Sequence, residues 1–107
     1  MSYKVIPTPQ FEKEVKKLSK KYPSAKGDIV NLVNELKENP TMGIPLANNC
    51  FKIRLAIKSK GKEKSGGSRV ITYLRVIKEV IHLLTIYDKS TQSTISDTEI
   101  IRLLEGL

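Results

Sequence analysis

The hydrophobic residues of this 107-residue chain change their spacing about halfway along it. Up to residue 39 they recur every three or four positions, the spacing that places side chains on one face of an α-helix. From residue 50 they alternate with polar residues, the period of two that indicates a β-strand with one buried face. Helices that precede a run of strands predict an α+β fold.

The N-terminal half predicts a short strand and then a helical hairpin. Residues 3–7 have the pattern of the strand, and Thr8 with Pro9 is a typical helix start, with threonine as the N-cap and proline in the first turn. We expect Ser24 to cap a second helix that ends at residues 39–40. The apolar faces of the two helices consist of Phe11, Val15, Leu18, Tyr22, Ile29, Leu32, Val33 and Leu36.

The C-terminal half predicts strands at residues 50–58, 69–76 and 80–88. The last of these is apolar on both faces, as expected for a central strand. A capping box at residues 96–99 then begins a short helix whose apolar face holds Ile100, Leu103, Leu104 and Leu107. The order β-α-α-β-β-β-α predicts one domain of residues 1–107, an antiparallel sheet with the helical hairpin on one face.

Positive charge is the first indication of function. The chain has 19 Lys and Arg against 11 Asp and Glu, a net charge of +8, which favours a polyanionic partner such as nucleic acid, or an acidic protein. Lys52 and Arg54 are two positions apart on one strand, so both side chains point to the same face. Gly66 and Gly67 would let backbone amides approach a phosphate. The basic residues of this segment are Lys52, Arg54, Lys58, Lys60, Lys62, Lys64 and Arg69.

Each of these features also has a plain structural explanation. Alternating basic residues are common on a solvated strand face, and paired glycines are common in turns. Their combination across two adjacent strands and the connecting loop favours an anion-binding site over these explanations, but spacing alone does not identify the anion.

Other chemistries fit the sequence less well. The single cysteine, Cys50, excludes an internal disulfide and a cysteine-based zinc site. His82 lies within an apolar strand, where we expect it to pack, and the carboxylates are too scattered to predict a magnesium site. Glycine motifs for nucleotides, a membrane-spanning run and a signal sequence are absent from the sequence. We therefore expect a cytoplasmic protein without a metal or organic cofactor.

Four segments resemble the RelE/ParE superfamily, the toxins of bacterial type II toxin–antitoxin systems. They are "FEKEVKKLSKKYP", "FKIRLA", "GKEKSGGSRVITY" and "LLTIYDKS", which span most of residues 11–90 in the order of the family's elements. The glycine- and lysine-rich loop is similar to the RelE/HigB branch. The resemblance implies the RelE-like fold and a metal-free, ribosome-dependent mRNA endoribonuclease that inhibits translation. It also implies a cognate antitoxin as partner, with the ribosome and mRNA as targets.

The resemblance also implies functional residues. Lys52 and Arg54 match the family's paired basic residues, Arg69 its phosphate-binding arginine, and Lys89 a basic residue after the last strand. The family's catalytic tyrosine would fall near Ile95, so the nearby Tyr87 is the candidate for that role in this chain. The predicted RNA- and ribosome-binding residues are Lys58, Lys60, Lys62, Lys64, Gly66 and Gly67. We expect the side chain of Arg69 to be exposed.

Two alternatives remain at this point. A ParE-like inhibitor of DNA gyrase would share the fold without cleaving RNA, although that branch tends to lack the basic set of Lys52, Arg54 and Arg69. A non-catalytic RNA-binding protein would present aromatic side chains for stacking on bases. This chain has four Tyr and two Phe, several of them at apparent core positions, so it offers few.

Overall fold

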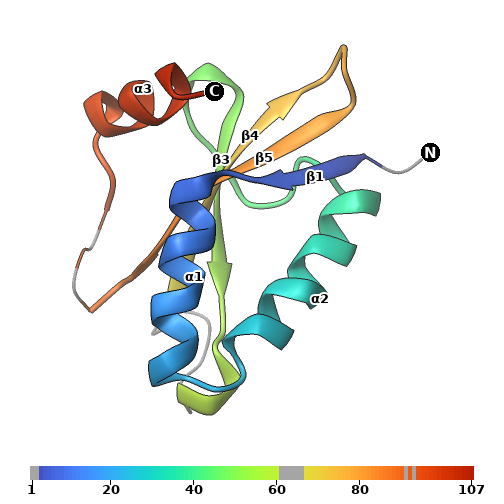
Figure 1. Ribbon diagram of the computed structural model, residues 1–107. Coiled ribbons are helices and arrows are strands. Elements are labelled where there is room, and N and C mark those ends of the chain that lie inside the picture. Colours follow the sequence, from blue (N-terminus) through green and yellow to red (C-terminus); the bar gives the residue numbers. More distant parts are fainter. Residues whose placement is uncertain (1–2, 61–66, 91, 93) are drawn as a thin grey trace.

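The computed structural model describes residues 3–60, 67–90, 92 and 94–107. Within these residues three helices and a five-stranded sheet form an α+β fold, which confirms the predicted class (Figure 1). The elements are β1 Lys4–Pro7, α1 Pro9–Lys21, α2 Ala25–Glu38, β2 Ile44–Pro45, β3 Cys50–Leu55, β4 Ser68–Arg75, β5 Val80–Asp88 and α3 Asp97–Glu105, with short 3₁₀ turns η1 Ala47–Asn49 and η2 Lys58–Lys60.

The strands follow the order β1-β5-β4-β3-β2 across the sheet. β3, β4 and β5 form the predicted antiparallel meander. The prediction of a wholly antiparallel sheet is wrong at one edge, where β1 runs parallel to β5, with Lys4 opposite Val80 and Pro7 opposite Leu83. No tight turn joins these two strands, so the hydrophobic pattern does not fix their relative direction. β2 is only two residues long and gave no pattern in the sequence.

One face of the sheet is covered by the helical hairpin. α1 and α2 meet at their short connection and diverge towards β1 (Figure 1). The buried residues of this helix-side cluster come from both layers. The predicted apolar faces of the two helices are confirmed except at Tyr22, which is the C-cap of α1 and lies outside this cluster. The buried residues of the cluster are Phe11, Ile29, Leu32, Leu36, Ile53, Val70, Leu74, Ile81, Leu83 and Ile86, with Val15, Leu18 and Val33 partly buried against them.

The other face is partly covered by α3. Ile100 and Leu103 pack on Cys50, Ile71, Leu84 and Tyr87, and these residues form the α3-side cluster. Leu107, predicted to join them, is 49% exposed instead. In the described part of the chain, no helix is long and apolar enough to cross a membrane.

The predicted helix starts are confirmed in part. The hydroxyl of Thr8 accepts the amide of Phe11 at 3.2 Å, as an N-cap does. Ser96 accepts the amide of Glu99 at 3.1 Å, but the Glu99 carboxylate binds Arg102 on the next turn of α3. Only the serine half of the predicted capping box therefore forms.

Gly67 is required by close packing between β3 and β4. A Cβ atom at this position would lie 2.4 Å from the carbonyl oxygen of Leu55, whereas a Cβ at Gly27 in α2 would meet nothing within 4 Å. We expect Gly67→Ala to destabilise the protein by about 1–3 kcal/mol, because backbone must move. We expect Gly27→Ala to stabilise it by up to about 1 kcal/mol. Urea unfolding followed by circular dichroism measures both. Equal stabilities would contradict the close approach at Gly67.

Candidate functional site

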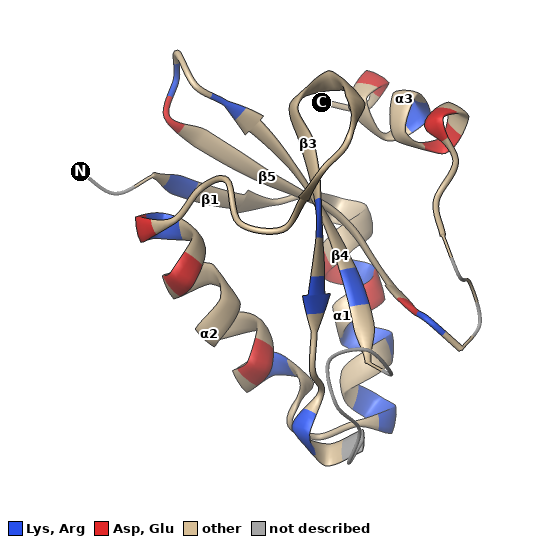
Figure 2. Cartoon of the chain, turned by 180° about the vertical axis from the view of Figure 1, so that it is seen from behind, with Lys and Arg blue, Asp and Glu red and all other residues tan. Residues whose placement is uncertain are grey.

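Three predicted site residues lie directly opposite one another on neighbouring strands. Arg54 of β3 pairs with Arg69 of β4, and Arg69 pairs with Tyr87 of β5. Directly opposed residues of antiparallel strands point to the same face, with Cβ atoms roughly 4.5–5.5 Å apart. Arg54, Arg69 and Tyr87 therefore form one cross-strand row. Lys52 lies two positions before Arg54 and shares its face, so the basic positions of β3 and β4 are side by side (Figure 2).

The members of this cross-strand row differ in burial. Arg54 is exposed and Lys52 is partly buried, but Arg69 is only 4% exposed and Tyr87 9%. The expectation that Arg69 is exposed is therefore wrong. Arg69 lies on β4, the middle strand of the meander, which has a neighbouring strand on each side. Arg54 lies on β3, and in the described chain the outer neighbour β2 pairs with β3 only at Phe51 and Lys52.

Arg69 and Tyr87 influence each other electrostatically. Burial raises the pKa of Tyr87, and the positive charge of Arg69 lowers it in part. The phenol is therefore neutral at pH 7. Its hydroxyl is buried and has no hydrogen-bond partner among the described groups. A neutral phenol with a free donor can give a hydrogen bond or a proton to an oxyanion once the groups that cover it move aside.

Lys89 follows β5 but stays close to the start of β4. Its backbone amide donates to the carbonyl of Gly67 at 3.3 Å, and its side chain is exposed. Gly67 itself is buried, and its packing against Leu55 accounts for the glycine at this position. A phosphate contact by its amide stays a prediction.

Residues 58 and 59, which follow β3, are tied to the start of α2. The Asp28 carboxylate accepts the amide of Lys58 at 3.0 Å and the hydroxyl of Ser24 at 2.8 Å. Ser24 and Ser59 also bond reciprocally, each amide donating to the other hydroxyl at 2.8 and 3.1 Å. Ser24 occupies the predicted N-cap position of α2, but its hydroxyl makes no cap bond to the backbone of that helix and serves these contacts instead.

Nothing in the sequence indicated that Asp28 would bind the segment after β3. An acidic residue in the first turn of a helix is common because it complements the helix dipole, and its contact with Lys58 spans 30 positions. The predicted strand of residues 50–58 is also too long. β3 ends at Leu55, where the chain turns towards η2 and its contacts with α2.

The structure thus brings Lys52, Arg54, Arg69 and Tyr87 together, and Lys89 lies just beyond the strand ends. Lys58 is exposed at the contact with α2, and the backbone of Lys60 lies in η2. The other predicted RNA-binding residues, Lys62, Lys64 and Gly66, lie outside the described residues.

His82 and Cys50 do not belong to this site. His82 stacks on Tyr73 with ring centroids 6.0 Å apart, at the opposite end of the β4–β5 pair from Tyr87. Burial and the charge of Arg75 lower its pKa, so the ring is neutral at pH 7. Burial raises the pKa of Cys50 to about 11 and keeps the thiol protonated. Among the described residues, no three or more His, Cys, Asp or Glu side chains are grouped to hold a metal ion.

The effect of the Arg69 charge on the pKa of Tyr87 gives a test of the geometry of the cross-strand row. Arg69→Met removes the cation that favours the Tyr87 phenolate, so we expect the pKa of Tyr87 to rise further above its ordinary value. Arg54→Met, one strand further away, should change it less. Absorbance titration at 295 nm, with the Tyr87→Phe protein subtracted to isolate this phenol, measures the change. A fall in the pKa after Arg69→Met would show that Arg69 does not face Tyr87.

No family model matches this chain. The fold is similar to a double mutant of the Escherichia coli toxin RelE in the free state, with a TM-score of 0.63 and 19% identity over 87% of this chain and 90% of that one. The isolated E. coli RelE toxin matches with a TM-score of 0.61 and 17% identity over 99% of this chain and 100% of that one. The RelBE2 toxin–antitoxin complex of Mycobacterium tuberculosis matches with a TM-score of 0.62 and 17% identity over 82% of this chain and 99% of the matched chain. The helical hairpin and the meander of this chain therefore form the RelE fold.

Proposed function

We propose that this chain is the toxin of a toxin–antitoxin pair and that it cleaves mRNA on the ribosome without a metal ion. The observation that carries the proposal is the cross-strand row of Arg54, Arg69 and Tyr87, with Lys52 beside it, on a RelE fold. These are the residue types that metal-free RNA cleavage needs, on one face of three hydrogen-bonded strands.

The proposed reaction is attack by a ribose 2′-hydroxyl on the adjacent phosphorus. The new bond joins the 2′-oxygen to phosphorus, the bond to the 5′-oxygen breaks, and the products are a 2′,3′-cyclic phosphate and a 5′-hydroxyl. A base must take the 2′ proton, cations must stabilise charge on the phosphoryl oxygens, and an acid must protonate the leaving 5′-oxygen.

Each role has a candidate in the site. Lys52 is the proposed base, and Arg54, at the surface, is the proposed bidentate contact to the phosphate. Arg69 is buried, so it acts through its charge from within the sheet, where the lower dielectric strengthens the interaction. Tyr87 is the proposed acid, since its phenol is neutral at pH 7. Lys89 extends the positive potential beyond the end of β5.

Substrate positioning is the part that we assign to the ribosome. Arg54 and Lys52 lie on a strand face, and effective catalysis there needs the reacting atoms to be held in line by another body. The charge of +8, and the loop lysines that include Lys58, favour binding to ribosomal and messenger RNA. The proposed place of action is the cytoplasm, where ribosomes are.

The proposed protein partner is a cognate antitoxin with an acidic binding segment. Two of the similar structures, from E. coli and M. tuberculosis, are toxin–antitoxin complexes. In this chain a groove of about 470 Å³ lies between α1 and α2, with Phe11, Val15 and Ile29 in its lining and Lys16 and Lys26 beside them. An acidic amphipathic helix suits such a groove, and an acidic strand suits the basic face of the sheet.

Expression without an antitoxin tests the proposed function. We expect induced cells to stop incorporating amino acids within minutes, with mRNA cut at positions occupied by ribosomes. Plasmid supercoiling, measured in the same cells, should stay normal. Normal translation combined with loss of supercoiling would support gyrase inhibition instead, and binding of RNA without cleavage would support the non-catalytic alternative.

Three alanine variants separate catalysis from attraction of RNA. We expect Lys52→Ala and Arg54→Ala to lower the single-turnover cleavage rate on ribosomes by about 10²-fold, because these groups act on proton transfer and developing charge. Lys58→Ala keeps the backbone amide that binds Asp28 and removes an exposed charge. It should weaken association, reduce its salt dependence and leave the rate at saturation unchanged.

Circular dichroism of the three proteins controls for folding. Equal and mild rate losses for all three variants would mean that the face is an electrostatic surface and that the catalytic assignment is wrong.

A further inference from the structure

The side chains of β5 do not alternate regularly. Leu83 packs in the helix-side cluster, whereas Tyr87 packs in the α3-side cluster. Residues four positions apart in a regular strand point to the same face. One extra residue must therefore lie between Leu83 and Tyr87, and it changes the face of every residue that follows it.

Pairing with β4 identifies the extra residue. Ile71 lies opposite Thr85, and the next residue of β4, Thr72, lies opposite Leu83. Leu84 is left without a directly opposed partner, which is the arrangement of a β-bulge. Bulges bend a strand and redirect the side chains beyond them, here Ile86 towards the helices and Tyr87 towards Arg69.

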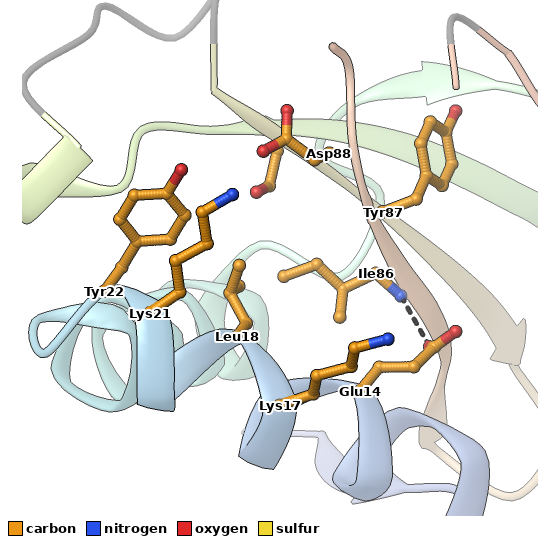
Figure 3. Close-up of a pocket in the computed structure, with 9 residues that line it drawn as sticks. Glu14, Lys17, Leu18, Lys21, Tyr22, Ile86, Tyr87 and Asp88 are labelled. Carbon is orange, nitrogen blue, oxygen red and sulfur yellow. Dashed lines mark hydrogen bonds between the residues drawn. The ribbon is translucent and has the colours of Figure 1, made fainter. Parts of the chain in front are cut away.

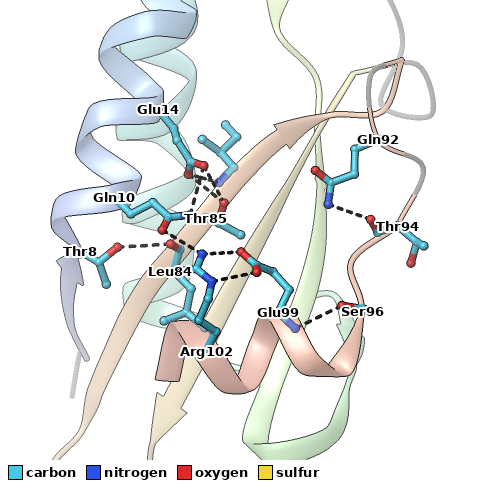
Figure 4. Close-up of polar contacts among 11 residues, drawn as sticks. Thr8, Gln10, Glu14, Leu84, Thr85, Gln92, Thr94, Ser96, Glu99 and Arg102 are labelled. Carbon is cyan, nitrogen blue, oxygen red and sulfur yellow. Dashed lines mark hydrogen bonds and ion pairs between the residues drawn. The ribbon is translucent and has the colours of Figure 1, made fainter. Parts of the chain in front are cut away.

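The bulge lies where β5 loses its outer neighbour. Pairing between β1 and β5 ends at Pro7 and Leu83, and α1 runs beside β5 after that point. Beyond that point the side chain of Glu14 in α1 supplies a hydrogen-bond acceptor to β5 in place of a neighbouring strand. Its carboxylate oxygen Oε1 accepts the backbone amide of Ile86 at 3.1 Å (Figure 3). The same oxygen accepts the hydroxyl of Thr85 at 2.8 Å (Figure 4).

The Glu14 carboxylate is itself held in place. Gln10, one turn earlier in α1, donates to its second oxygen at 3.3 Å, and Arg102 of α3 donates to Gln10 at 3.3 Å (Figure 4). A cavity of about 310 Å³ lies beside the carboxylate, lined in part by Leu18, Ile86 and Tyr87 (Figure 3). The strand therefore has room to move if the carboxylate is removed.

We propose that Glu14 is the positioning residue for Tyr87. By holding the amide of Ile86 and the hydroxyl of Thr85, it stabilises the bulge that turns Tyr87 onto the face of Arg54 and Arg69. Regular alternation after Leu83 would direct Tyr87 towards α1 and α2 instead. The consequence for catalysis rests on the proposed function, but the effect on the position of Tyr87 does not.

The test uses Glu14→Ala in the full chain, with three measurements. We expect amide hydrogen exchange at Ile86 to become at least about 10-fold faster, because its acceptor is gone. Tyr87 should titrate closer to the ordinary tyrosine value, because burial raises its pKa only while the ring stays in place. Single-turnover mRNA cleavage should fall by about 10-fold or more, with the half-saturating concentration changed by less than about 3-fold.

Glu12→Ala is the matched control, since it removes the same charge from an exposed position of the same helix. It should resemble the unmodified protein in all three measurements. Glu14→Gln keeps one oxygen acceptor, so it should restore part of the Ile86 protection and of the cleavage rate. If Glu14→Ala does not fold, the same measurements on Glu14→Gln decide.

The outcomes separate the two proposals. If the unmodified protein does not cleave mRNA, the proposed function fails, while exchange at Ile86 and titration of Tyr87 still test the role of Glu14. If Glu14→Ala leaves both the Ile86 exchange and the Tyr87 titration unchanged, the inference is overturned, whatever happens to cleavage.

Discussion

The pairing of β4 with β3 on one side and β5 on the other determines both the core and the candidate site. A one-residue slip between two strands would reverse the faces of all side chains on one of them. On β3 such a slip would place Lys52 and Arg54 among the helix-side apolar residues and expose Ile53, which is 3% exposed in the native register. Burying those charges without partners would cost several kcal/mol. The apolar face of β3 therefore holds the basic face in register.

The position of Tyr87 carries a cost in stability. Its neighbour Arg69 is buried as well, and the guanidinium of Arg69 donates to the carbonyl of Ser68 at 3.3 Å. The buried hydroxyl of Tyr87 has no partner among the described groups, which costs about 1–3 kcal/mol. A cost of this kind is characteristic of residues retained for function.

Local patterns in the sequence were sufficient for the features that depend on neighbouring residues. The start of α1 at Thr8 and the bounds of β5 at residues 80–88 follow from capping chemistry and β-propensity. Placing Lys52, Arg54 and Arg69 on one face needed only strand alternation and the assumption that consecutive strands pair. The function proposed for that face came from family resemblance, because spacing alone indicated an anion site and no more.

The features that could not be predicted depend on contacts between distant parts of the chain. The direction of β1 and the burial of Arg69 depend on the order of strands in the sheet. The bonds from Glu14 to Ile86 and from Asp28 to Lys58 span 72 and 30 positions. The bulge at Leu84 could not be recognised from the sequence either. β5 is apolar on both faces, so its hydrophobic pattern does not reveal a change of face.

The C-terminal segment bears on how the proposed acid is supported. Ile95, near the position where the resemblance implied a tyrosine, is partly buried and packs against the α3-side cluster that contains Tyr87. In the proposed mechanism the acid therefore belongs to the sheet and not to the segment before α3. Its distance from Arg69 is set by direct strand pairing, and its orientation by the bulge that Glu14 stabilises. Hydrogen-bonded strands change shape less than a terminal segment does. In this mechanism the spacing of Tyr87 and Arg69 is therefore fixed, and the groups that cover the buried hydroxyl of Tyr87 must move aside before RNA reaches it.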